Sequence, residues 1–214
     1  MNQRKPVSLT LHVALVAAVV LLAGAGCTLF PTAQPPPRLF VLTPKSTFSK
    51  DLPTAGWQLT VGLPVADTGL NTARIALRRS PVSLEYFERA NWIDTAPSMV
   101  QTLLLESFGN SNRIVAVGRQ SVSLRADYSL LLELREFQAE YGADGVPSAR
   151  VRINVKLVKM PQRNIIASIA VQKVVKARGA GMVSVVEAFD AALGKALKRI
   201  VEWTLRTAPP KPPR

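Results

Sequence analysis

The chain has 214 residues, with one cysteine, one histidine and a formal net charge of +13. A single cysteine excludes an intramolecular disulfide, and one cysteine with one histidine cannot complete a zinc site. The length suits one domain, and 48% hydrophobic with 19% charged residues indicates a folded chain. The positive charge favours an acidic partner, which could be nucleic acid, an anionic membrane or another protein.

Residues 1–26 have the pattern of a secretory signal peptide. Arg4 and Lys5 precede an apolar segment over residues 9–26, which ends in four small residues, alanine and glycine in alternation. A positive start, an apolar middle and small residues at the end are the three parts of such a signal. His12 lies inside this segment, so a catalytic centre that needs a histidine is nearly excluded from the exported chain.

Cys27 follows directly after these small residues. This junction resembles the lipobox of bacterial lipoproteins, in which the thiol is diacylated and the signal is cut before the cysteine. The usual leucine three positions earlier is replaced by Gly24, a small residue that lipoboxes tolerate. Two or three acyl chains, at about 0.8 kcal/mol per buried methylene, would anchor the chain durably. The alternative is an incidental thiol in an uncleaved signal anchor.

The rest of the chain reads as a spacer, one domain and a tail. Residues 27–37 combine Cys27 with a spacer that is rich in proline, and residues 208–214 are a proline-rich tail that we expect to be disordered. The domain between them covers residues 38–207. Removal of Arg4 and Lys5 with the signal, and of no acid, lowers the net charge only from +13 to +11, so the basic character belongs to the domain.

The first half of the domain predicts short strands and one helix. Strands are expected at 38–42, 58–63, 74–79, 83–87 and 113–117, where β-branched and apolar residues are interrupted by proline and other turn residues. A helix is expected over 97–108, after Thr95 or Ala96 and before Gly109, because proline is favoured in a first turn and glycine at a helix end. Trp57 and Trp92 are expected in the core.

The second half predicts a β-meander and a long helix. Strands are expected at 127–138, 149–159 and 165–176, joined by turns at 142–145 and 161–164. A final amphipathic helix is expected over 185–205, with a capping box formed by Ser184 and Glu187. The fold class is therefore α/β: a mixed, largely antiparallel sheet with two principal helices packed on it.

The middle strand of the meander has one apolar and one basic face. Arg150, Arg152 and Lys156 alternate with valine, isoleucine and leucine, so they share a face. Such a face is either ordinary solvated surface or a contact for anionic phospholipid head groups or an acidic partner, at about 1 kcal/mol per basic residue. Nucleic acid is disfavoured, since the chain is exported and no aromatic residues accompany the charge.

No enzyme signature stands out in the sequence. A Walker-type phosphate loop is absent, so the chain does not itself hydrolyse ATP, and Gly179-Ala-Gly181 is too short for a dinucleotide site. Glu133, Glu136 and Glu140 lie on or beside one strand, where a solvated face is favoured over an acid–base pair. We therefore expect no catalytic residues, no metal and no cofactor.

An ordered set of segments resembles the ABC-type transport auxiliary lipoprotein family (PqiC-like). After the lipobox and spacer come Arg38-Leu-Phe-Val-Leu42 and Val61-Gly-Leu-Pro-Val65, then Ile75-Ala-Leu-Arg-Arg-Ser-Pro-Val-Ser-Leu-Glu-Tyr-Phe87, Trp92 with Pro97, and the terminal helix. The resemblance spans nearly the whole domain. It implies an α/β sandwich related to anticodon-binding-domain-like folds and brings no catalytic residues.

The resemblance also implies a place and partners. It implies a lipoprotein on the periplasmic side of a Gram-negative outer membrane, and Thr28 after the cysteine allows that sorting because aspartate there favours inner-membrane retention. Its partners would be an MCE-domain substrate-binding protein, a permease and an ATPase that move phospholipids or other hydrophobic molecules. The alternative is a structural lipoprotein of envelope assembly that binds another envelope complex, although no peptidoglycan-contact motif is found.

Overall fold

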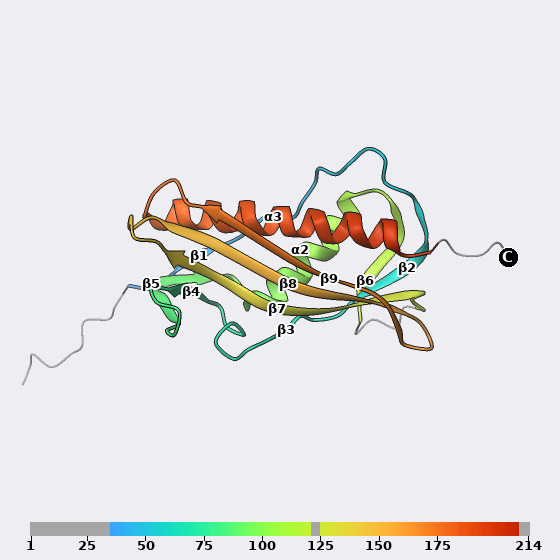
Figure 1. Cartoon of the computed structure of the whole chain (residues 1–214), viewed down its shortest axis with the longest axis horizontal. Coiled ribbons are helices and arrows are strands. Elements are labelled where there is room, and N and C mark those ends of the chain that lie inside the picture. The colour runs from blue at the N-terminus through green and yellow to red at the C-terminus, as the bar shows by residue number, and fades with distance from the viewer. Residues whose placement is uncertain (1–34, 121–124, 210–214) are drawn as a thin grey trace, which may run out of the picture. The chain divides into compact units, whose positions relative to one another are not determined.

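Nine strands and two helices make up the described residues, 35–120 and 125–209, of the computed structural model (Figure 1). Their bounds are β1 Arg38–Phe40, β2 Ala55–Val61, β3 Val65–Ala66, β4 Arg74–Arg78, β5 Glu85–Trp92, α2 Ala96–Asn110, β6 Ile114–Arg119, β7 Tyr128–Tyr141, β8 Pro147–Lys159, β9 Asn164–Lys176 and α3 Met182–Thr207. The predicted strands and both helices are confirmed, with ends that shift by a few residues. The two-residue β3 had no signal in the sequence.

The sheet is organised around β7, its longest strand. Three short strands lie parallel to one edge of β7: β2 at its start, β3 at its middle and β4 at its end. Along its other edge β8 pairs antiparallel over almost the whole strand, and β9 pairs antiparallel with β8. β6 extends β2, β5 extends β4 and β1 extends β5. The predicted mixed sheet is confirmed, and its longest pairings are antiparallel.

A β-bulge interrupts β7 between Leu134 and Glu136, where its register with β8 shifts. Before the bulge the side chains of Leu130, Leu132 and Leu134 are buried, and after it those of Phe137 and Ala139 are buried. Strict alternation would send either Leu134 or Phe137 to the solvent face. The extra residue corrects this phase, so both remain in the core while Arg135 and Glu136 stay outside it.

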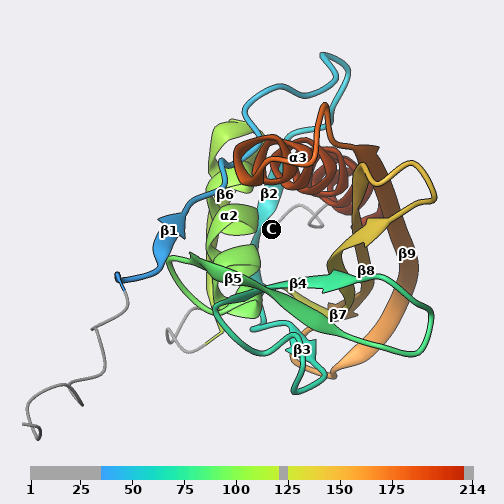
Figure 2. The ribbon, with the colours of Figure 1, turned by 90° about the vertical axis from the view of Figure 1, so that its left-hand side faces the viewer.

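Both helices lie on one side of the sheet, which curves around them (Figure 2). α3 packs against β8, β9 and α2. Trp92 at the end of β5, Phe137 of β7 and Phe189 of α3 meet in one aromatic cluster, with ring centroids 5.1–5.7 Å apart. Trp57 and Trp92 are each only 1% exposed, which confirms that both are core residues. The opposite face of the sheet carries the polar side chains, and we call it the outer face.

One local prediction is wrong. The capping box of Ser184 and Glu187 does not form, because α3 begins at Met182 and Gly181 is its N-cap residue, without a side-chain cap. Both residues lie inside the helix. Neither α2 nor α3 is long and apolar enough to cross a membrane.

Candidate functional site

The alternation predicted for β8 is present. Val151, Ile153 and Val155 are fully buried beneath α3, whereas Arg152 and Lys156 are exposed and Arg150 is half-buried. The three basic residues therefore share the outer face of the sheet, as the sequence predicted. Residues that lie opposite each other in antiparallel strands share a face of the sheet. The residues of β7 and β9 that lie opposite the three basic residues therefore decide what this surface can bind.

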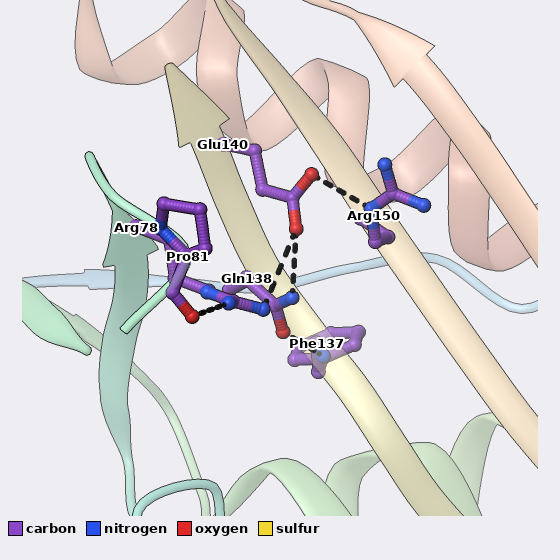
Figure 3. A network of polar contacts seen from close by, with 6 residues as sticks. All are labelled: Arg78, Pro81, Phe137, Gln138, Glu140 and Arg150. Atoms are coloured by element: carbon purple, nitrogen blue, oxygen red, sulfur yellow. Dashed lines mark hydrogen bonds and ion pairs between the residues drawn. The ribbon is translucent and has the colours of Figure 1, made fainter. Parts of the chain in front are cut away.

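Arg150 belongs to a polar network on β7 and the turn after β4 (Figure 3). Its Nε donates to Oε2 of Glu140 at 2.7 Å, and Arg78 approaches the same carboxylate at 3.9 Å. Gln138 donates from Nε2 to Glu140 at 3.1 Å and accepts from the backbone N–H of Phe137 at 2.8 Å. Arg78 also donates to the carbonyl of Pro81. The network holds the β4–β5 turn against the outer face.

Lys156 is also paired. Its Nζ lies 3.4 Å from Glu133, which Asn154 and Arg135 approach at 3.5 Å and 4.0 Å. Hydrogen bonds from Asn154 and then Lys156, with the positive charge of Lys156, lower the pKa of Glu133 below its ordinary value. The carboxylate therefore stays ionised at neutral pH and offsets the charge of Lys156.

Arg152 differs from the other two basic residues. Its side chain is exposed and forms no hydrogen bond or ion pair with any residue of the described ranges. Of the predicted contact surface, Arg152 alone therefore presents a guanidinium that is free to meet an anion. The sequence missed the pairing of its neighbours, although the short turn of residues 142–146 between β7 and β8 was a usable signal for register.

The structure separates the three glutamates that sequence reasoning grouped. Glu140 and Glu133 are each paired with basic side chains, whereas the side chain of Glu136 has no partner within residues 35–120 and 125–209. Among residues 35–120 and 125–209, no group of three or more His, Cys, Asp or Glu side chains could hold a metal ion. Cys27, the predicted lipidation site, lies outside the described residues.

Relatives share this architecture. The chain is similar to protein XCC0632 from Xanthomonas campestris, with a TM-score of 0.76 and 28% identity over 79% of this chain and 95% of that one. A second uncharacterized structure has a TM-score of 0.61 at 15% identity, covering 78% and 97% of the two chains, which shows a common fold alone. The chain is also 31% identical over 114 residues to the uncharacterized protein bll6063 of Bradyrhizobium diazoefficiens. That match covers 53% of this chain and only 30% of the relative.

A family model described as the ABC-type transport auxiliary lipoprotein component matches residues 40–201, which include every strand from β2 to β9, α2 and most of α3. The description of this family names a lipoprotein and an auxiliary part of ABC-type transport. Because the match extends over most of the chain, this protein belongs to the family of ABC-type transport auxiliary lipoproteins.

Proposed function

We propose that this protein is a non-enzymatic auxiliary lipoprotein of an MCE-type ABC system. It is anchored to the outer membrane through Cys27, faces the periplasm, and assists the movement of phospholipids or other hydrophobic molecules between membranes. The observation that carries this proposal is the family match over residues 40–201 in a chain whose only cysteine follows a signal-like segment.

The position of Cys27 supports the anchor. A diacylated or triacylated cysteine buries enough methylenes to hold a protein on a membrane durably. The proline-rich residues 31–37 would form an extended spacer between this anchor and the domain. Thr28, in the place where aspartate favours the inner membrane, supports the outer membrane as the destination.

The chemistry of the outer face supports an auxiliary rather than a catalytic role. The carboxylates of Glu133 and Glu140 are each held by basic side chains, so neither is placed to share a proton with a second acid. The sequence has no Walker motif, so a partner must supply ATP hydrolysis. We propose an MCE-domain substrate-binding protein, a permease and an ATPase as those partners.

Two measurements test the proposal. The wild-type protein should incorporate labelled palmitate, appear in the outer-membrane fraction and co-purify with an MCE-domain protein after mild crosslinking. The Cys27→Ser variant should lose the label and the outer-membrane fractionation. Labelling that persists in Cys27→Ser would refute the anchor. A lipidated protein that co-purifies with an envelope-assembly complex and with no MCE-domain protein would favour the alternative of a structural lipoprotein.

A further inference from the structure

A pocket of about 350 Å³ lies on the outer face beside the network of Glu140. It is bounded by the turn that follows β3, the β4–β5 turn and the bulged part of β7. Its lining includes the charged and apolar side chains of Asp67, Arg78, Val82, Leu84, Arg135 and Glu136. The β4–β5 turn holds the Arg-Ser-Pro-Val-Ser-Leu segment of residues 79–84, which the proposed function leaves without a role. A volume of this size suits a small polar group with an apolar extension.

The bulge in β7 creates this lining. Because Leu134 and Phe137 both face the core, the two residues between them are left on the outer side. Arg135 and Glu136 therefore line the pocket as consecutive residues, which a regular strand would place on opposite faces. Two consecutive residues of β7 thus place one positive and one negative side chain in the pocket.

Two carboxylates of the pocket have no cationic partner in the part of the chain that the structure describes. Glu136 is half-buried, and its Oε2 is enclosed without a hydrogen bond. Asp67 is exposed, and its side chain forms no ion pair or hydrogen bond with the described residues. Arg152 stands opposite Glu136 in the register but forms no ion pair with it. Oε2 is closed to a ligand, so an ammonium would meet Glu136 through Oε1, and a carboxylate whose charge no described cation neutralises favours such a ligand.

The pocket also has a basic and an apolar side. Arg78 is held by Glu140 and Pro81, whereas the side chain of Arg135 is 55% exposed and has, among the described residues, only a loose ion pair with Glu133, at 4.0 Å. Arg135 is therefore free to turn its guanidinium to a phosphate. Val82 and Leu84 add exposed apolar surface at the rim, with Val82 95% exposed. A ligand that complements all three features has an ammonium, a phosphate and an apolar part.

We propose that this pocket binds the head group of a phospholipid that carries a primary ammonium beside its phosphate, as phosphatidylethanolamine does. The ammonium lies against Glu136 and Asp67, the phosphate against Arg135, and the glycerol end of the lipid against Val82 and Leu84. A primary ammonium suits this site because its three N–H donors can serve both carboxylates. The assignment rests on the proposed transport of phospholipids, and it names the lipid class for which this domain has a site.

The test uses the full-length lipoprotein in detergent micelles, titrated by calorimetry with soluble head groups. Glycerophosphoethanolamine should bind saturably, and glycerophosphoglycerol, which lacks the ammonium, should bind about tenfold more weakly. Glu136→Gln should weaken binding of glycerophosphoethanolamine about tenfold and leave glycerophosphoglycerol unchanged. Arg135→Gln should weaken both. The matched control is Glu106→Gln on α2, an exposed glutamate that is not part of the pocket lining, which should change neither.

A second arm identifies the source of the head group. Native mass spectrometry of the wild-type protein extracted from membranes should show retained phosphatidylethanolamine, and the Glu136→Gln protein should show much less. Equal affinity of Glu136→Gln and wild type for glycerophosphoethanolamine would overturn the pocket. Binding of the soluble head group without retained lipid would overturn the lipid assignment in favour of a soluble amine phosphate.

Failure here is distinguishable from failure of the proposed function. Palmitate labelling and co-purification with an MCE-domain protein do not involve this pocket, so they should persist in Glu136→Gln. If they persist while head-group binding is absent from the wild type, the pocket assignment falls and the transport role stands.

Discussion

Phe137 follows the bulge of β7, and replacing its side chain tests how much the packing of the aromatic cluster stabilises the fold. Phe137 is 1% exposed, and its ring centroid lies 5.7 Å from that of Trp92 and 5.1 Å from that of Phe189. It therefore joins β7, β5 and α3 at one point. Phe137→Ala removes this ring and leaves a cavity among elements that are held in place by the rest of the core, so little of the space can be refilled.

The expected loss of unfolding free energy is about 3–5 kcal/mol, the range for a buried phenylalanine replaced by alanine. Each aromatic pair contributes about 0.5–1.5 kcal/mol beyond burial, and Phe137 makes two such pairs, which favours the upper part of that range. For a domain of this size the midpoint of thermal unfolding should fall by roughly 6–20 °C. Since domains are typically stable by about 5–15 kcal/mol, the variant should still fold in most of that range.

The assay is urea unfolding of the purified protein, followed by tryptophan fluorescence and by circular dichroism. Leu131→Ala is the matched control, because Leu131 lies on the same strand but is 37% exposed on the outer face, and its loss should be below about 1 kcal/mol. A double-mutant cycle of Phe137→Ala with Phe189→Leu should show coupling of about 0.5–1.5 kcal/mol. A loss in Phe137→Ala no larger than in Leu131→Ala, with an unchanged denaturant slope, would show that the ring of Phe137 does not stabilise this part of the core.

Two further predictions concern acid stability and the basic face. Glu202 accepts hydrogen bonds from the backbone N–H and the hydroxyl of Ser49, both at 2.9 Å. Burial alone would raise the pKa of Glu202, but these hydrogen bonds and the charges of Lys198 and Arg206 outweigh burial and leave the pKa below its ordinary value of 4.5. The ionised Glu202 therefore stabilises the folded protein fully above pH 4.5, and this stabilisation is lost as the pH falls through the lower pKa of the folded state. Glu202→Gln should lower the free energy of unfolding by about 1–2 kcal/mol at neutral pH and by progressively less in acid. Urea unfolding measured at a series of pH values would show this trend. The second prediction concerns the basic face and is measured by sedimentation of a chain starting at residue 35 with phosphatidylglycerol vesicles. Arg152→Gln should weaken the free energy of binding by about 1 kcal/mol, whereas Lys156→Gln should weaken it less, because Glu133 already offsets the charge of Lys156. Equal effects of the two variants would contradict the view that Arg152 is free and Lys156 is paired.

Local pattern alone was enough for most of the secondary structure. The period-2 alternation of residues 150–157 identified β8 and both of its faces, because a half-buried strand must alternate whatever it pairs with. The apolar stripe of Phe189, Leu193, Leu197 and Ile200 identified α3 for the same reason, at helical spacing, and all four are fully buried. The start of α3 was misplaced because a capping pattern is a weak local preference, and packing extended the helix past it to Met182.

The binding properties of the outer face were decided by tertiary structure. The sequence gathered Arg150, Arg152 and Lys156 on one face, but which of them is free depends on the carboxylates that the pairing of β7 with β8 sets beside them. The bulge at Arg135 and Glu136 shifts that pairing by one residue, and it exists because both Leu134 and Phe137 gain more by burial than a regular ladder would give.

The amino-acid pattern was sufficient to predict one basic domain, most of its strands and helices, and the single cysteine at the signal-like junction. Ion pairing, by contrast, follows from the tertiary structure: of the three predicted contact residues Arg150 and Lys156 are paired and Arg152 is not, and Glu136 lines a pocket without a partner among the described residues. The physical reason is that alternation depends on neighbours within a strand, whereas ion pairing depends on register between strands, which long-range packing sets.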